Sequence, residues 1–148
     1  MATILMDTNL LVYLVDQNEL DKQSRAVETL NVLELHHAGR LSAQNLAEFI
    51  HVAIHKLRPR LAIDEAMEWA GRFARVWPVF DLTPQIILEA ARGVRDHRLA
   101  YYDAQIWASA RLNQVSVIFS EDFQDGLFLE GVKFVNPFKP GFDINQWV

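Results

Sequence analysis

Short apolar runs alternate with amphipathic stretches along the whole chain, and this alternation limits the folds that the chain can adopt. Apolar and β-branched runs are typical of strands, whereas apolar residues three or four positions apart predict helices. The expected strands cover 2–6, 41–43, 77–82, 115–119 and 132–135, and the expected helices cover 22–37, 44–57, 64–75, 84–96 and 103–113, with a helix or turn at 10–14. Strands that alternate with helices indicate an α/β domain with a mainly parallel central sheet flanked by helices.

Residues with fixed conformational preferences mark several of the expected helix ends. Gly39 lies where a C-capping glycine would close the first long helix, and Asp64 is a suitable N-cap for the third. Thr83 before Pro84 provides a capping hydroxyl and a proline at the first helical position. Pro59 ends the second long helix, because the residue before a proline disfavours the α conformation. These signals set the expected helix boundaries.

The length and composition indicate one cytoplasmic domain. A chain of 148 residues fits a single domain, which we expect to span 1–148. The absence of cysteine excludes disulfides and thiolate zinc sites and favours a cytosolic protein. No basic stretch precedes the N-terminal apolar run and Asp7 soon follows it, so we do not expect a signal peptide. No apolar stretch approaches the roughly 20 residues that a membrane helix needs, so we expect no association with a membrane.

The net charge of −5 argues against a generally basic, nucleic-acid-binding surface. Basic residues nevertheless outnumber acidic ones between Lys56 and Arg98, and acids dominate the rest of the chain. The middle could therefore offer a modest basic surface, or the charges could be scattered by chance. Arg92, Arg95 and Arg98 share one side of their expected helix and could contact phosphate, although an ordinary solvated surface is the favoured interpretation.

Two aspartates occur where an open parallel sheet binds its ligands, beyond the carboxyl ends of the strands. Asp7 ends the first expected strand, and Asp122 follows the strand at 115–119. Asp103 opens a helix, and it would lie at the same end of the sheet if that helix leads into the strand at 115–119. Carboxylates held close together repel one another, and their pKa values rise. A hard divalent cation removes this repulsion, and Mg²⁺ and Mn²⁺ favour carboxylate oxygens. The aspartates therefore predict a site for such a cation.

Each of these acids also has a purely structural interpretation. Asp7 is followed by a threonine and an asparagine and could simply cap a turn. Asp103 could be only an N-cap, which is the commonest use of aspartate at a helix start. Asp122 could be an acid of a surface loop. Taken one at a time, the three positions leave both interpretations open.

The helix expected at 44–57 places Glu48, His51 and His55 on the face opposite its apolar stripe. Periodicity alone therefore predicts that Glu48 is a solvated surface residue. The two histidines have the four-residue spacing that zinc sites use. Val52 stands where the zinc metalloprotease motif requires a glutamate, so two exposed histidines are the favoured interpretation.

Five segments, taken in order, resemble the PIN-domain family. They read ILMDTNLLVY at 4–13, LSAQNLAEF at 41–49, YDAQIWA at 102–108, SEDFQDG at 120–126 and GVKFVNPF at 131–138. The last two have the form seen in one subgroup of VapC-type toxins. Any one segment is a weak signal, whereas the ordered set is a strong one and spans essentially the whole chain.

The resemblance implies a PIN-like fold, in which a parallel sheet flanked by helices carries four acids around Mg²⁺ or Mn²⁺. On this sequence the four acids, which would be both catalytic and metal-binding, are Asp7, Glu48, Asp103 and Asp122. The helix that carries Glu48 must then turn that face toward the cleft, against the periodicity argument. The implied activity is hydrolysis of RNA, in which the metal orients a water and lowers its pKa for in-line attack on a phosphodiester.

The resemblance also concerns the residues around the fourth acid. Asn9 and Ser120 match positions that help to order the site. Glu121 precedes Asp122 and Asp125 follows it, so either neighbour could share the fourth acidic position. The number of metal ions and the residue that would act as an acid or base are left open.

A VapC-type toxin implies particular partners. The substrate would be RNA, with tRNA and rRNA as candidates, and a cognate small antitoxin would lay its tail across the acidic cleft. A basic side chain of that tail would lie among the carboxylates, and a homodimer would join two antitoxin arms. Trp69, Phe73 and Trp77 follow helical spacing and could provide an apolar docking surface, although a place in the core is favoured.

Other functions fit less well. A haloacid-dehalogenase-like phosphatase needs a second aspartate where Asn9 stands, and a receiver domain needs paired acids after the first strand. The six glycines form no phosphate loop. Two alternatives stay open, namely a catalytically silent PIN-like scaffold that binds RNA or a protein and a nuclease directed at DNA, because contacts to the 2′-hydroxyl cannot be located from the sequence.

Overall fold

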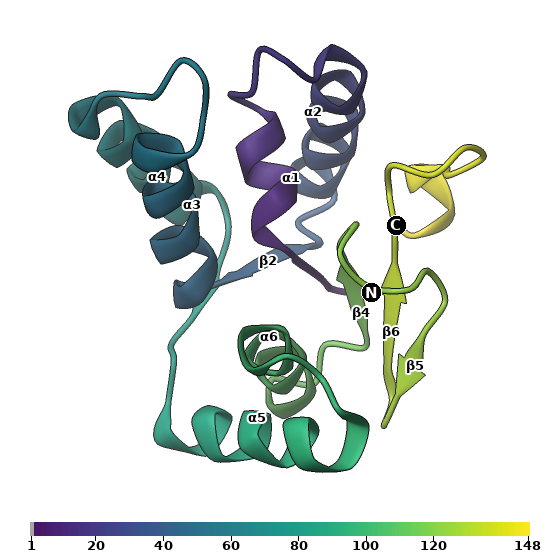
Figure 1. Ribbon diagram of the computed structural model, residues 1–148. Coiled ribbons are helices and arrows are strands. Elements are labelled where there is room, and N and C mark those ends of the chain that lie inside the picture. Colours follow the sequence, from purple (N-terminus) through teal and green to yellow (C-terminus); the bar gives the residue numbers. More distant parts are fainter. Residues whose placement is uncertain (1) are drawn as a thin grey trace.

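A six-stranded sheet with the strand order β3-β2-β1-β4-β6-β5 forms the centre of the computed structural model, which describes residues 2–148 (Figure 1). The strands are β1 (Ile4–Met6), β2 (Gly39–Ser42), β3 (Val79–Phe80), β4 (Val117–Phe119), β5 (Phe128–Leu129) and β6 (Val132–Val135). All neighbouring strands are parallel except β5, which pairs antiparallel with β6 at one edge. The expectation of an α/β fold with a mainly parallel sheet is confirmed.

Helices cover both faces of this sheet (Figure 1). They are α1 (Thr8–Tyr13), α2 (Leu20–Leu35), α3 (Ala43–His55), α4 (Ile63–Val76), α5 (Pro84–His97) and α6 (Tyr101–Leu112), and a 3₁₀ turn follows at Ile144–Gln146. The first four lie on one face, and α5 and α6 lie on the other (Figure 1). None of the helices within residues 2–148 combines the length and the apolar character needed to cross a membrane.

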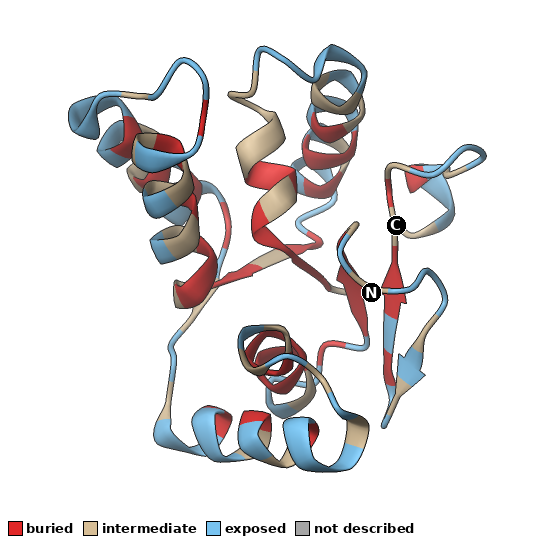
Figure 2. Ribbon diagram, in the orientation of Figure 1, coloured by how far each residue is buried: buried red, intermediate tan, exposed pale blue. Residues whose placement is uncertain are grey.

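The alternation of side chains along β1 divides the core into two layers. Ile4 and Met6 point to the face covered by α1 to α4, whereas Leu5 points to the face covered by α5 and α6. All three are completely buried, and buried segments line both faces of the sheet (Figure 2). On the second face, Gly93 of α5 lies so close to Trp107 that a Cβ atom would come within 2.8 Å of the indole ring.

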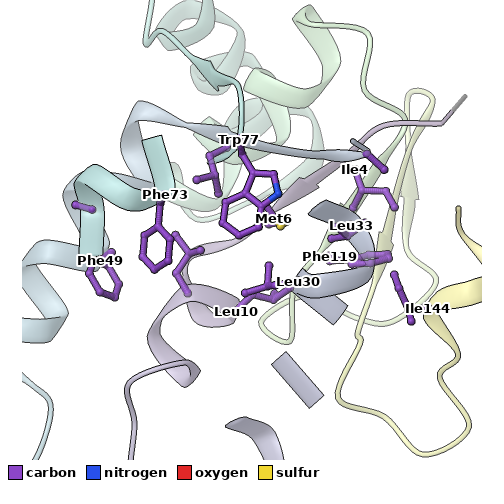
Figure 3. Packing of buried hydrophobic residues seen from close by; sticks show 14 of the residues in the cluster. Ile4, Met6, Leu10, Leu30, Leu33, Phe49, Phe73, Trp77, Phe119 and Ile144 are labelled. Atoms are coloured by element: carbon purple, nitrogen blue, oxygen red, sulfur yellow. The ribbon is translucent and has the colours of Figure 1, made fainter. Parts of the chain in front are cut away.

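The aromatic stripe of α4 lies in the first layer of the core. Phe73 packs edge to face on Phe49 of α3 with 5.1 Å between ring centroids, and it also contacts Trp69 and Trp77 (Figure 3). Phe73 and Trp77 are 2 % and 7 % exposed, and only Trp69 is partly exposed. The stripe is therefore core, and the use of these residues as a docking surface is wrong.

Two predicted helix boundaries are also wrong. Gly39 does not cap α2, which ends at Leu35, but begins β2, where a Cβ atom would come within 2.8 Å of the Trp77 ring. Asp64 lies inside α4, whose N-cap is Ala62. Glycine at position 39 is thus required for close packing rather than for a turn, a distinction that the local sequence does not carry.

Candidate active site

The carboxyl ends of β2, β1 and β4 meet at one edge of the sheet, and the polar side chains of the candidate site follow directly from them. Asp7 comes immediately after β1 and is the N-cap of α1. Ser120 follows β4, and Ser42 at the end of β2 caps α3. Because β1 lies between the other two strands, Asp7 has the central position of the three. This is where open α/β sheets bind their ligands.

Asp7 is almost fully buried, with 5 % of its surface exposed. One carboxylate oxygen accepts from the backbone N–H of Thr8 at 2.8 Å, and the other accepts from the hydroxyl of Ser120 at 2.7 Å. The pKa of Asp7 is raised to about 7, mainly by burial and also by the charges of Asp122 and Glu48, against the lowering effect of these two bonds. Asp7 therefore caps α1 and also lies in an acidic environment, so its two interpretations are compatible.

Glu48 is half-buried and tied to α1, so the prediction of a solvated surface residue is wrong. One of its carboxylate oxygens accepts from Thr8 Oγ1 at 2.8 Å, and the other accepts from Gln44 Nε2 at 2.6 Å. Asn45 donates in turn to Thr8 Oγ1 at 3.2 Å. Gln44 and Asn45 are buried polar residues, and a stripe counted only on apolar residues misplaces the inward face of α3. Phe49, next to Glu48, and Ala53 are the fully buried apolar residues of α3.

Asp103 lies in the first turn of α6, two residues after the helix begins. The N-cap is Ala100, so the interpretation of Asp103 as only an N-cap is wrong. Burial raises the pKa of Asp103, and the charges of Asp122 and Glu48 add to the effect. Its carboxylate thus faces the same acids that surround Asp7.

Asp122 is held by a small polar network at the end of β4. Its carboxylate accepts from Asn9 Nδ2 at 3.2 Å, and its backbone N–H donates to Ser120 Oγ at 3.1 Å. Asn9 Nδ2 also lies 3.4 Å from the hydroxyl of Ser120. Asn9 and Ser120 therefore connect Asp122 with Asp7, since the same Ser120 hydroxyl donates to Asp7.

The two acids beside Asp122 have other partners. Glu121 forms an ion pair with Lys22 at 2.9 Å and accepts a hydrogen bond from the hydroxyl of Tyr13. Burial and this hydrogen bond raise the pKa of Tyr13 to about 12. Asp125 accepts from the backbone N–H of Asn136 at 2.8 Å. Glu121 and Asp125 are absent from the charges that raise the pKa values of Asp7 and Asp103. The geometry favours Asp122 as the acid of this loop that faces the site.

The charges of Glu48 and Asp122 therefore act on both Asp7 and Asp103, and oxygen donors of this kind suit Mg²⁺ or Mn²⁺. The oxygen Asn9 Oδ1 is buried beside them without a hydrogen-bond partner. Within residues 2–148, no three histidine, aspartate or glutamate side chains lie close enough to form a ready-made metal site. Mg²⁺ usually keeps several waters and takes only one or two carboxylates directly, so the donor set fits a hydrated ion.

The histidines and arginines singled out in the sequence lie outside this cluster. His51 and His55 stack on each other at 4.8 Å between ring centroids and are exposed on α3. Arg92 pairs with Glu89, Asp96 and Glu130, and Arg95 pairs with Asp96, so the interpretation of a solvated, ion-paired surface is favoured. The sequence did not identify the three residues that orient Glu48, namely Thr8, Gln44 and Asn45. Only Asn45 had a detectable signal, because it forms a capping box with Ser42 three positions earlier.

The model of the PIN domain family matches residues 4–124 of the chain. No curated protein matches the chain. Among solved structures, the chain is similar to a toxin–antitoxin complex from Klebsiella pneumoniae, with 19 % identity, a TM-score of 0.63 and coverage of 91 % of this chain and 98 % of that chain.

Two further solved structures have the same fold. DNA-bound VapBC from Salmonella typhimurium is 18 % identical with a TM-score of 0.67, over 93 % of this chain and 99 % of that chain. Mycobacterium tuberculosis VapC20, described as a toxin that cleaves the sarcin–ricin loop, is 19 % identical with a TM-score of 0.61, over 86 % of this chain and 98 % of that chain. At these identities the likeness concerns the fold.

Proposed function

Because the chain belongs to the PIN domain family, we propose that it is a metal-dependent endoribonuclease and the toxin of a VapBC-type toxin–antitoxin pair. The observation that carries the proposal is that two buried or half-buried acids respond to the same two neighbours, since the charges of Glu48 and Asp122 raise the pKa values of both Asp7 and Asp103. A similar fold belongs to a toxin that cleaves the sarcin–ricin loop, which favours RNA over DNA as the substrate.

In this proposal Asp7, Glu48, Asp103 and Asp122 hold Mg²⁺ or Mn²⁺. Such an ion, when bound, supplies the charge that activates a water for attack on a phosphodiester and stabilises the leaving oxygen. The chain itself fixes the donors, because Ser120 and the Thr8 N–H hold the carboxylate of Asp7. Thr8 and Gln44 hold Glu48 in the same way, and Asn9 holds Asp122.

The raised pKa of Asp7 adds a pH dependence to this arrangement. A carboxyl with a pKa of about 7 is protonated in a large fraction of molecules at neutral pH when no cation is present. Protons and the divalent cation therefore compete for Asp7, and activity at limiting metal concentration should rise with pH up to and beyond 7.

Cleavage of RNA by the purified protein tests the activity. The protein should cut total cellular RNA in Mg²⁺ or Mn²⁺ and stop when a chelator is added, and Asp7→Asn should be inactive. The matched control is Asp81→Asn, which makes the same chemical change at an exposed position between β3 and α5. Undiminished cleavage in excess EDTA would contradict the metal mechanism. Cleavage of DNA in place of RNA would favour a nuclease directed at DNA. If the protein cleaves neither RNA nor DNA, a catalytically silent scaffold is favoured.

The partner in this proposal is a small antitoxin whose tail crosses the acidic cleft. Two of the similar folds come from toxin–antitoxin complexes. A carboxylate cluster that repels itself would accept an arginine or lysine of such a tail in place of the cation. We also propose a homodimer, for which the exposed Ile87, Leu88 and Val94 of α5 offer apolar surface.

Co-expression tests the partner. Expression of this chain alone should arrest growth, and co-expression of the small protein encoded beside it should restore growth. Normal growth in the absence of that neighbour, or a neighbour that neither binds nor restores growth, would contradict the toxin assignment even if the nuclease assignment stands.

A further inference from the structure

A groove of about 820 Å³ lies between α3, the start of α6 and the loop after β3. Glu48, one of the four acids of the candidate site, lines it. Its volume falls in the range of roughly 300–1,000 Å³ that small-molecule sites occupy. The lining on α3 includes Ala43 and Ala47, whose small side chains leave room beside the helix. Leu82 lines it from the loop after β3. The groove therefore offers an apolar recess that reaches the candidate site at Glu48.

Tyr102 lines the same groove from α6 and directly precedes Asp103. Tyr102 is 67 % exposed. Its ring packs edge to face on Tyr101 at 5.2 Å between centroids, and its backbone carbonyl accepts from Gln44 Nε2 at 3.1 Å. The backbone is thus anchored to α3 while much of the ring faces solvent.

The groove also carries positive or potentially positive groups away from the acids. His51 and Lys56 line it from α3, one and two turns beyond Glu48, and both are exposed. The acids alone would repel the phosphates of a nucleic acid chain. A lysine and a histidine at the far end provide contacts for a phosphate beyond the metal site.

We propose that this groove binds an unpaired RNA base next to the phosphate that is cut, with the ring of Tyr102 stacking on the base. The inference rests on the proposed nuclease function and names how that site recognises its substrate. Three features favour a base over an apolar peptide, namely the exposed ring beside Asp103, the apolar floor of alanines and the basic groups of Lys56 and His51. Stacking on an aromatic ring tolerates every base, so Tyr102 contributes affinity for unpaired nucleotides rather than a sequence code.

A double-perturbation cycle tests the stacking. The substrate is a single-stranded oligoribonucleotide that spans the strongest cleavage site mapped in total RNA, and a series replaces one base at a time by an abasic ribose. Tyr102→Ala should lower kcat/KM on the intact oligonucleotide by about tenfold, the loss expected when a base–aromatic stack is removed. At one abasic position next to the cut, wild type and Tyr102→Ala should become equal. Tyr102→Phe and Tyr102→Trp should retain the wild-type rate.

Phe128→Ala is the matched control, because Phe128 is similarly exposed at 64 % but lies on β5, outside the groove. This variant should cleave every oligonucleotide at the wild-type rate. Equal rates of Tyr102→Ala and wild type on the intact oligonucleotide, or a loss that persists with every abasic substrate, would overturn the stacking role. Unchanged RNA cleavage together with weakened binding of the antitoxin would overturn it too, in favour of a peptide in the groove. A wild-type protein that cuts no RNA would instead contradict the proposed function itself.

Discussion

Replacement of Asp7 by asparagine should stabilise the protein, and by an amount that depends on pH. Asparagine has nearly the same shape, can accept from the Thr8 N–H through its oxygen and can donate to Ser120 Oγ through its amide. It carries no charge, however, and the pKa of Asp7 shows how unfavourable that charge is in the fold. In the proposed site, Asp7 is thus a group whose ionisation opposes stability.

The magnitude follows from the pKa of Asp7, which is raised from 3.8 to about 7. Each unit corresponds to 1.36 kcal/mol, so ionisation of Asp7 destabilises the fold by about 4 kcal/mol, a ceiling that relaxation around the charge reduces. In the wild type, Asp7 does not reduce the free energy of unfolding below pH 3.8, where its carboxyl is protonated in both states. The free energy of unfolding then falls as the carboxyl ionises in the unfolded chain, and the reduction is complete above about pH 7. The gain from Asp7→Asn should therefore grow between these two pH values and then level off.

Thermal unfolding of both proteins from about pH 4 to pH 8 in a chelating buffer measures this difference. At the upper end, Asp7→Asn should melt up to about 16 °C higher than wild type, because 1 kcal/mol shifts the midpoint of a domain of this size by about 2–4 °C. Asp81→Asn should follow the wild-type curve throughout. Mg²⁺ should stabilise wild type more than Asp7→Asn. A gain that is absent, or equal at all pH values, would refute the burial of an ionisable Asp7 among other acids.

Two further variants test the site and the core. Glu48→Gln should remove most of the RNA cleavage, whereas His55→Ala, a change outside the groove, should retain most of it; the reverse pattern, in the same assay, would favour an imidazole-based site. Gly93→Ala should lower the free energy of unfolding by about 1–3 kcal/mol, because its Cβ atom would meet the buried indole ring at 2.8 Å. Gly71→Ala on α4, where the nearest atom is a flexible arginine end at 3.4 Å, should be neutral or stabilising in chemical denaturation.

The order of strands and helices could be predicted because it depends on local periodicity. Asp7 and Asp122 could be located for the same reason, since they follow strands whose apolar runs are unmistakable. The edge strand β5 could not, because two residues carry no periodic signal. Gly39 was given the wrong role because its requirement arises from the distant Trp77.

Glu48 shows where periodicity fails at the candidate site. The inward face of α3 near its N-terminus is made of Gln44 and Asn45, which are buried through hydrogen bonds with residues distant in the sequence. A pattern of apolar residues cannot detect such a face. The resemblance to a family pointed to Glu48, and the hydrogen bond from Thr8 supplies the physical reason for its inward position.

Titration of Mn²⁺ into the metal-free protein, followed by electron paramagnetic resonance and paired with RNA cleavage at each Mn²⁺ concentration, tests the central claim most directly. That claim is that Asp7, Glu48, Asp103 and Asp122 form one cation-dependent site for cutting RNA. Binding and cleavage of the wild type should rise together, and Asp103→Asn should weaken both. Cleavage without bound Mn²⁺ or any other divalent cation, or Mn²⁺ binding that Asp103→Asn leaves unchanged, would contradict the claim.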